Sequence, residues 1–134
     1  MVELTKTFEL DCDVLDQDHK QLVEMVNEII AMLDNGETGK CRDKVAEFAS
    51  FTKGHFGREE NYLAKSGYPD IEKHRQHHRY LMEKIDHMVE FASAADDNEI
   101  ACESLKKELV FFVMDDVITS DLDFKSYVSD NPAD

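Results

Sequence analysis

The sequence has few residues that break helices and little positive charge. Its 134 residues include two prolines, five glycines and no tryptophan, and 15 lysines and arginines stand against 30 aspartates and glutamates. The scarcity of proline and glycine argues against a sandwich of short strands and tight turns, and favours long helices. The net charge of −15 disfavours nucleic acid and anionic membrane surfaces as partners, because both are negatively charged themselves. A metal cation is electrostatically compatible with such a chain.

Cysteines and long apolar runs are equally scarce. Cys12, Cys41 and Cys102 are odd in number and lack a CxxC spacing. The sequence opens Met-Val-Glu-Leu-Thr, without the basic region and apolar run of a signal peptide. No apolar stretch approaches the length of a membrane span. We therefore expect a soluble protein of the reducing cytoplasm, with no disulfide framework and no membrane segment.

The residues that are present predict an all-α domain. Hydrophobic residues make up 42% of the chain and charged residues 34%, which is typical of a globular protein. Apolar residues recur at helical spacing, and Asn35-Gly36, Ser66-Gly67, Pro69 and Asp96-Asp97-Asn98 separate the periodic segments. We expect one domain over residues 1–134, an antiparallel up-down-up-down four-helix bundle. Its parts are an arm over 1–15, helices over 16–34, 38–65, 69–93 and 98–121, and a tail over 122–134 that is either a short helix or a linker.

Ionisable residues interrupt the apolar stripes of all four predicted helices. They are His19, His55, Glu59, His74, His78, Asp116 and Asp121. Alternating helix directions bring all seven to one end of the bundle. Burial of so many ionisable groups is very unfavourable unless bound cations compensate it. Imidazole with carboxylate suits iron, manganese or zinc, and seven candidates are too many for one ion but suit two ions bridged by carboxylates. His77 and His87 fall off the stripes, and we interpret them as surface residues.

Five short motifs resemble the hemerythrin family, specifically the bacterial hemerythrin domains, over about Phe8 to Phe124. They are Asp18-His19-Lys20, His55-Phe56-Gly57-Arg58-Glu59-Glu60, Gly67-Tyr68-Pro69, His74-Arg75-Gln76-His77-His78, and the segment from Phe112 to Asp121. The resemblance implies two iron ions with an oxo or hydroxo bridge. His19 and His55 would bind one iron, His74 and His78 the other, and Glu59 and Asp121 would bridge them. It also implies an apolar pocket for a diatomic ligand, formed by Leu22, Phe56, Phe112, Val113 and Val117.

Asp116 departs from the family pattern, in which a histidine five residues before the bridging aspartate completes the second iron's ligands. An aspartate here could bind iron directly, bind it through a water, or leave the site more open. Direct binding would add negative charge and stabilise the ferric state. The adjacent Asp115 is a poorer substitute, because it points about a quarter-turn away on a regular helix.

The function expected from this pattern is a non-haem di-iron oxygen-binding domain, acting as an oxygen or redox sensor with readily autoxidised iron. Its ligand would be O2 or another small diatomic molecule or anion, and a C-terminal signalling output domain is a possible partner. The alternatives are a reversible oxygen carrier or store, and a di-iron enzyme with peroxidase, oxidase or nitric oxide chemistry. The sequence identifies no catalytic acid, base or substrate pocket, so we do not expect an enzyme. The number of candidate ligands disfavours a purely structural zinc site.

Overall fold

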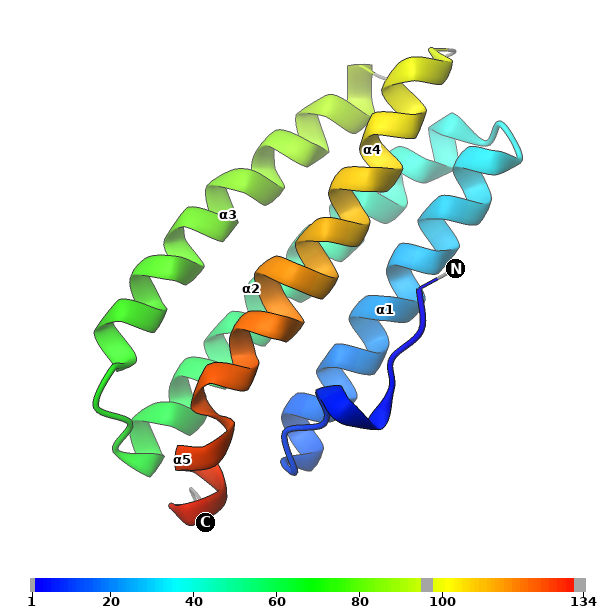
Figure 1. Cartoon of the computed structure of the whole chain (residues 1–134). Helices are drawn as coiled ribbons and strands as arrows, with labels where there is room; N and C mark the ends of the chain where they lie inside the picture. Colours follow the sequence, from blue (N-terminus) through cyan, green and yellow to red (C-terminus); the bar gives the residue numbers. More distant parts are fainter. Residues whose placement is uncertain (1, 95–97, 132–134) are drawn as a thin grey trace.

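Four long helices form the protein, whose computed structural model describes residues 2–94 and 98–131. They are α1 (Asp13–Asp34), α2 (Thr38–Ser66), α3 (Ile71–Ala94) and α4 (Glu99–Phe111), and α4 continues directly into the π-helical segment η2 (Phe112–Thr119). Figure 1 shows that successive helices run in alternate directions. The expected all-α four-helix bundle is confirmed. Among the described helices, none combines the length and the apolar character that crossing a membrane requires.

The helix ends follow the residues that separate the periodic segments, with small differences from the expected bounds. Gly36 and Gly67 follow α1 and α2 with φ of +72°, a left-handed conformation that glycine adopts without steric penalty. α3 begins at Ile71, and Pro69 lies in the turn before it rather than in its first turn. The Asn98 side chain accepts a hydrogen bond from the Ala101 amide and so caps α4. Asp96 and Asp97, the other two residues of this expected break between helices, lie outside the described residues.

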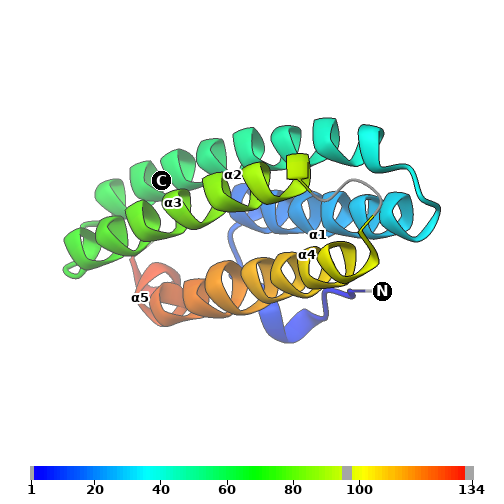
Figure 2. The ribbon, with the colours of Figure 1, turned by 90° about the horizontal axis from the view of Figure 1, so that it is seen from above.

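Two apolar clusters fill the bundle, one along its length and one at the end where α2 meets α3. The larger contains Phe48, Leu81 and Ile85, all fully buried. The smaller consists of Leu10, Cys12, Leu15, Leu63, Phe124 and Val128. The amino-terminal arm, with its short 3-10 helix η1 (Lys6–Phe8), folds back beside the bundle (Figure 2). Val2 exchanges two hydrogen bonds with the Asn27 side chain, and Leu10 ends in the smaller cluster.

The tail after α4 is helical where it is described. The 3-10 turn η3 (Leu122–Phe124) leads into α5 (Lys125–Asp130). Phe124 is fully buried in the smaller cluster, and the Tyr127 hydroxyl donates to the Ser66 and Gly67 carbonyls at 2.9 and 2.8 Å. Of the two alternatives expected for the tail, the short helix is therefore the one present up to Asp130, and it covers the end of the bundle. Residues 132–134 of the expected tail lie outside the described part.

The π-helical segment decides which side chains of the fourth helix face inward. One row of buried residues recurs at every fourth position, namely Leu105, Leu109, Val113, Val117 and Asp121, and Phe112 and Ile118 are buried beside it. In a regular α-helix of 3.6 residues per turn this row would drift around the axis. The i→i+5 bonds of η2 widen its turns, which rotates the row back toward the core. Asp121 is thereby buried, whereas Asp116 stands one position off the row.

Candidate metal centre

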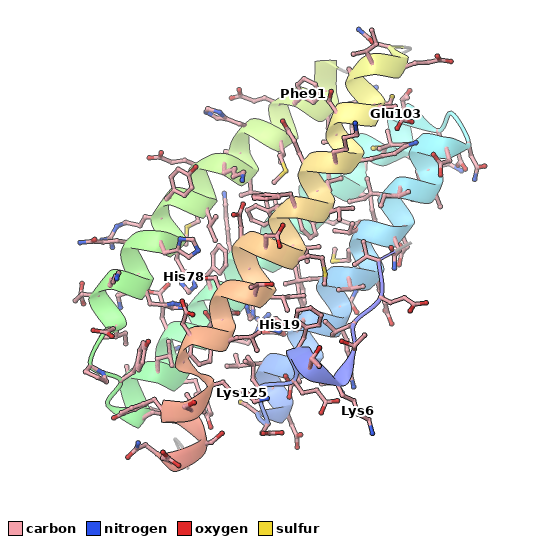
Figure 3. All side chains as sticks on the ribbon, viewed as in Figure 1. Lys6, His19, His78, Phe91, Glu103 and Lys125 are labelled. Atoms are coloured by element: carbon pink, nitrogen blue, oxygen red, sulfur yellow. The ribbon has the colours of Figure 1, made fainter. Side chains whose placement is uncertain are left out.

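Six of the seven candidate ligands meet between the two apolar clusters. His19 comes from α1, His55 and Glu59 from α2, His74 and His78 from α3, and Asp121 follows η2. Figure 3 shows His19 and His78 on their different helices in the lower half of the bundle. His19, His55 and Glu59 are fully buried, and Asp121 is 2% exposed. The convergence expected from alternating helix directions is therefore present for these six residues.

The six residues form two groups that share both carboxylates. One group is His19, His55, Glu59 and Asp121; the other is Glu59, His74, His78 and Asp121. Within each group the candidate donor atoms lie within 4.8 Å of one another. Two histidines with two shared carboxylates on each side is the donor set expected for two adjacent ions with carboxylate bridges.

Both histidines of each group face the shared carboxylates through Nε2. His19 Nε2 lies 2.8 Å from Asp121 Oδ2, and His55 Nε2 lies 3.0 Å from Glu59 Oε2. On the other side, His78 Nε2 lies 3.0 Å from Glu59 Oε1, and His74 Nε2 contacts the same oxygen. Nitrogen lone pairs and carboxylate oxygens therefore converge on two adjacent positions.

Polar atoms without a protein partner support metal binding at these positions. His55 Nε2 and Glu59 Oε2 are buried and make no hydrogen bond to any described residue. Buried polar atoms are almost always satisfied, and a bound ion is one of the few ways to satisfy them otherwise. The residues present therefore fit a metal pair, which would supply the missing partners.

The buried carboxylates of this cluster favour the protonated forms of two of its histidines. Burial alone would lower the pKa of His55, but the carboxylates of Asp121, Asp18 and Glu59 around its ring raise it well above its usual value. His74 is shifted in the same direction, since burial is outweighed by its contacts with Glu59. Burial and the neighbouring Glu59 charge raise the pKa of Asp121. Cations from outside can replace these protons, because metal ligands bind in their deprotonated forms.

We expect the metal-free protein to lose thermal stability as pH rises above the ordinary histidine pKa of about 6.5. Raised folded-state pKa values on His55 and His74 stabilise the fold fully below that pH, and this stabilisation is lost as pH rises through the folded values. The metal-bound protein has no such protons to lose. Melting temperatures measured from pH 6 to pH 9, with and without metal, test this. A metal-free midpoint that stays level or rises over this range contradicts it.

Asp116 does not join either donor group. Its carboxylate forms an ion pair with Lys84 of α3, and its backbone carbonyl accepts a hydrogen bond from His77 Nε2 at 3.1 Å. The Asp116 side chain is 17% exposed, against 3% for Asp121. His77, expected at the surface, is thus partly buried and binds η2, whereas His87 is exposed as expected.

Aromatic rings close the cluster on both sides. Phe56 of the larger apolar cluster stacks on His78, with ring centroids 4.1 Å apart and planes 14° apart. Phe124 of the smaller cluster meets the His74 ring edge-on at 5.4 Å. An aromatic ring therefore packs against a histidine on each of these two sides. The expected pocket residues are all buried at 0–1% exposure, in the larger cluster; they are Leu22, Phe56, Phe112, Val113 and Val117.

One polar cavity reaches the cluster from the surface. It has a volume of about 500 Å³ and borders His74, which is 9% exposed. Its other lining residues are Tyr68, Asp70, Lys73, His77, Ser120 and Asp123. Small polar molecules can therefore approach the His74 side of the centre, whereas the His19 and His55 side is closed by protein.

Two further carboxylates contact the histidines and were not found from the sequence. Asp18 accepts from His55 Nδ1 at 2.9 Å, and Glu60 accepts from His78 Nδ1 at 3.0 Å. Each stands next to a metal-site residue in the chain, Asp18 beside His19 and Glu60 beside Glu59. Consecutive residues on a helix point about 100° apart. Asp18 and Glu60 therefore do not point the same way as His19 and Glu59, and each contacts a histidine on a neighbouring helix. The position of Asp18 and Glu60 next to candidate ligands in the sequence could have indicated a role at the site. Only the packing of the helices shows which histidine each carboxylate contacts.

Comparison with known proteins identifies the family. The sequence profile described as Hemerythrin HHE cation binding domain matches residues 11–117. This range includes all four histidines of the two donor groups and Glu59. It ends before Asp121, so the assignment of Asp121 to the site rests on the structure.

Similar proteins carry the same family name. A Bacteriohemerythrin of Clostridium acetobutylicum is 31% identical over 83 residues, which are 59% of this chain and 64% of that protein. A Bacteriohemerythrin of Stenotrophomonas maltophilia is 26% identical over 73 residues, 54% and 48% of the two chains. One from Pseudomonas aeruginosa is 26% identical over 84 residues, 62% and 55% of the two chains. The matched part is therefore about half to two-thirds of the length of these curated relatives.

The sequence resemblance is thus confirmed at the level of the family. The two buried donor groups, joined through Glu59 and Asp121, match the expected di-iron cofactor. The chain belongs to the hemerythrin HHE cation-binding domain family.

Proposed function

We propose that this chain is a di-iron oxygen-binding domain that responds to oxygen or redox state and does not store oxygen. The observation that carries the proposal is the pair of buried donor groups that share Glu59 and Asp121. His19 and His55 would hold one iron, and His74 and His78 the other. When bound, the metal pair supplies reversible one-electron redox chemistry and open positions for a small ligand. The protein supplies the donors and the aromatic rings of Phe56 and Phe124 that pack against His78 and His74.

The Lys84–Asp116 ion pair supports the redox-responsive role. Of the three possibilities for Asp116, this contact favours a side chain that stays off the metal, because its charge is already partnered. The His74 and His78 side then has two imidazoles and the two shared carboxylates, as the His19 and His55 side does. Iron commonly takes six ligands, so both sides keep open positions. An open centre favours oxidation of the metal over reversible storage of oxygen.

The cavity at His74 also supports the redox-responsive role, because it gives small molecules access to the centre. Its lining is polar, and it includes Lys73 and His77 next to His74. Water and small anions can enter such a space and would reach the centre at His74, where a bound metal would meet them. A change of ligation there would act directly on η2, because His77 bonds to the Asp116 carbonyl. Transmission from η2 through α5 to a following output domain is part of this proposal.

The experiment is metal analysis and an absorption spectrum of the full chain purified without added metal, then reduced anaerobically and exposed to air. We expect two irons per chain, oxo-bridge charge-transfer bands in the oxidised protein, and rapid return of these bands on exposure to air. A stoichiometric content of zinc in place of iron contradicts the proposal. A long-lived oxygen adduct instead points to the carrier function.

Peroxide reduction is the second candidate function, and the cavity at His74 is the observation that favours it. Hydrogen peroxide is small and polar, and a space of about 500 Å³ admits it. Steady-state turnover with peroxide and an electron donor separates the two functions. Turnover that is lost when the metal is removed supports the enzyme, and its absence in an iron-loaded sample supports the binding domain.

A further inference from the structure

Two histidines of the centre are held through the ring nitrogen that faces away from the metal site. His55 Nε2 faces Glu59 and Asp121, while its Nδ1 lies 2.9 Å from Asp18 Oδ2. His78 Nε2 faces Glu59, while its Nδ1 lies 3.0 Å from Glu60 Oε2. A carboxylate can only accept, so each Nδ1 carries the proton. That tautomer leaves the Nε2 lone pair directed at the metal position.

An arginine fixes each of these carboxylates. Arg58 donates to Asp18 from Nε at 2.8 Å and from a terminal nitrogen at 3.0 Å, a two-pronged contact. Its guanidinium also lies over the Phe51 ring, 5.2 Å from the centroid. Arg75 Nε lies 3.3 Å from Glu60 Oε1, and a second nitrogen of Arg75 pairs with Glu72. Two arginine–carboxylate–histidine chains therefore run from the surface to the centre.

The two arginine–carboxylate–histidine series have the same arrangement. Asp18 reaches from α1 to His55 on α2, and Glu60 reaches from α2 to His78 on α3. Each donor group thus contains one histidine oriented from a neighbouring helix. His19 differs from them, because its Nδ1 is buried without a hydrogen-bond partner among the described residues.

We propose that Asp18 with Arg58, and Glu60 with Arg75, are positioning residues that fix His55 and His78 as strong metal donors, one on each ion. The proposal rests on the di-iron function proposed above. A carboxylate on Nδ1 holds the ring in place and increases its electron donation to the metal, which stabilises the more positive ferric state. Removing it is expected to weaken metal binding and raise the midpoint potential. If these carboxylates served only to connect helices, their removal would change neither the metal affinity nor the midpoint potential.

The test uses Asp18→Asn and Glu60→Gln in the full chain, which remove the charge and keep the size. Chelator competition measures ferrous affinity, redox titration measures the midpoint potential, and thermal melting of the metal-free protein measures the fold. We expect affinity to fall by about 10- to 100-fold in each variant, the usual effect of losing such a partner. We also expect a more positive potential. Asp18→Glu, which keeps the carboxylate, is expected to recover part of both.

Glu72→Gln is the matched control, because Glu72 pairs with the same Arg75 but contacts no ligand histidine in the described structure. It is expected to leave affinity and potential unchanged. Variants that melt earlier but keep wild-type affinity and potential overturn the positioning role while the di-iron function stands. An equal loss in Glu72→Gln overturns it as well. Absence of iron from the wild-type chain overturns the di-iron function itself and the positioning role with it.

Discussion

Glu59→Gln is expected to abolish binding of both metal ions. Glu59 is fully buried, and its two oxygens face opposite sides of the centre. Oε2 lies 3.0 Å from His55 Nε2, and Oε1 lies 3.0 Å from His78 Nε2. A neutral amide of the same shape offers one weak oxygen donor in place of two charged ones. Both donor groups lose a ligand at once, which a change in any single histidine cannot do.

Metal analysis of the purified variant measures this effect, and His19→Gln is the informative comparison. His19 belongs to one donor group only, so its replacement is expected to leave the ion at His74 and His78 partly bound. The fold is expected to survive Glu59→Gln, because glutamine has nearly the size of glutamate and the apolar clusters on either side of the centre are unchanged. Two irons per chain in Glu59→Gln would show that the carboxylate does not bridge the metals.

Asp116→His is expected to lengthen the lifetime of the oxygen adduct by about tenfold or more, a change of about 1.4 kcal/mol in the barrier to its loss. The substitution removes the partner of Lys84 and places an imidazole where the sequence resemblance leads us to expect one. Imidazole is longer than a carboxylate, and position 116 stands one residue off the inward row of η2. The new imidazole is therefore expected to reach the His74 and His78 side of the centre. There it would fill an open position and exclude water and anions.

The lifetime is measured by reducing the protein without oxygen, admitting air and following the oxo-bridged ferric bands. Lys84→Met is the companion variant, since it frees Asp116 without supplying a donor. It is expected to keep a short lifetime or shorten it further, because an unpaired carboxylate beside the centre stabilises the ferric state. A wild-type adduct that lasts as long as that of Asp116→His contradicts the proposed sensing role.

Most of the fold follows from local patterns that any reader of the sequence can see. Apolar spacing and the glycines at 36 and 67 place the first two helices within three residues of their observed bounds. The third helix begins two residues later than expected, because Pro69 is used in the turn and not in the helix. The fourth helix differs most, since a regular helix was expected to reach residue 121 and π-helical geometry begins at Phe112. Such widened turns depend on how the whole helix packs, and a local pattern does not contain that information.

The sequence predicted all six residues of the two candidate donor groups, together with Asp116, which joins neither group. His55 with Glu59, and His74 with His78, lie four apart and share a helix face whatever surrounds them. Alternating directions then bring these faces to one end of the bundle. The tertiary structure decided which of the two aspartates near the end of the fourth helix enters the centre. The widened turns of η2 bury Asp121, while Asp116 meets Lys84. It also decided that Asp18 and Glu60 orient histidines on neighbouring helices. Contacts between helices depend on rotation about each axis, which the packing of the complete bundle sets.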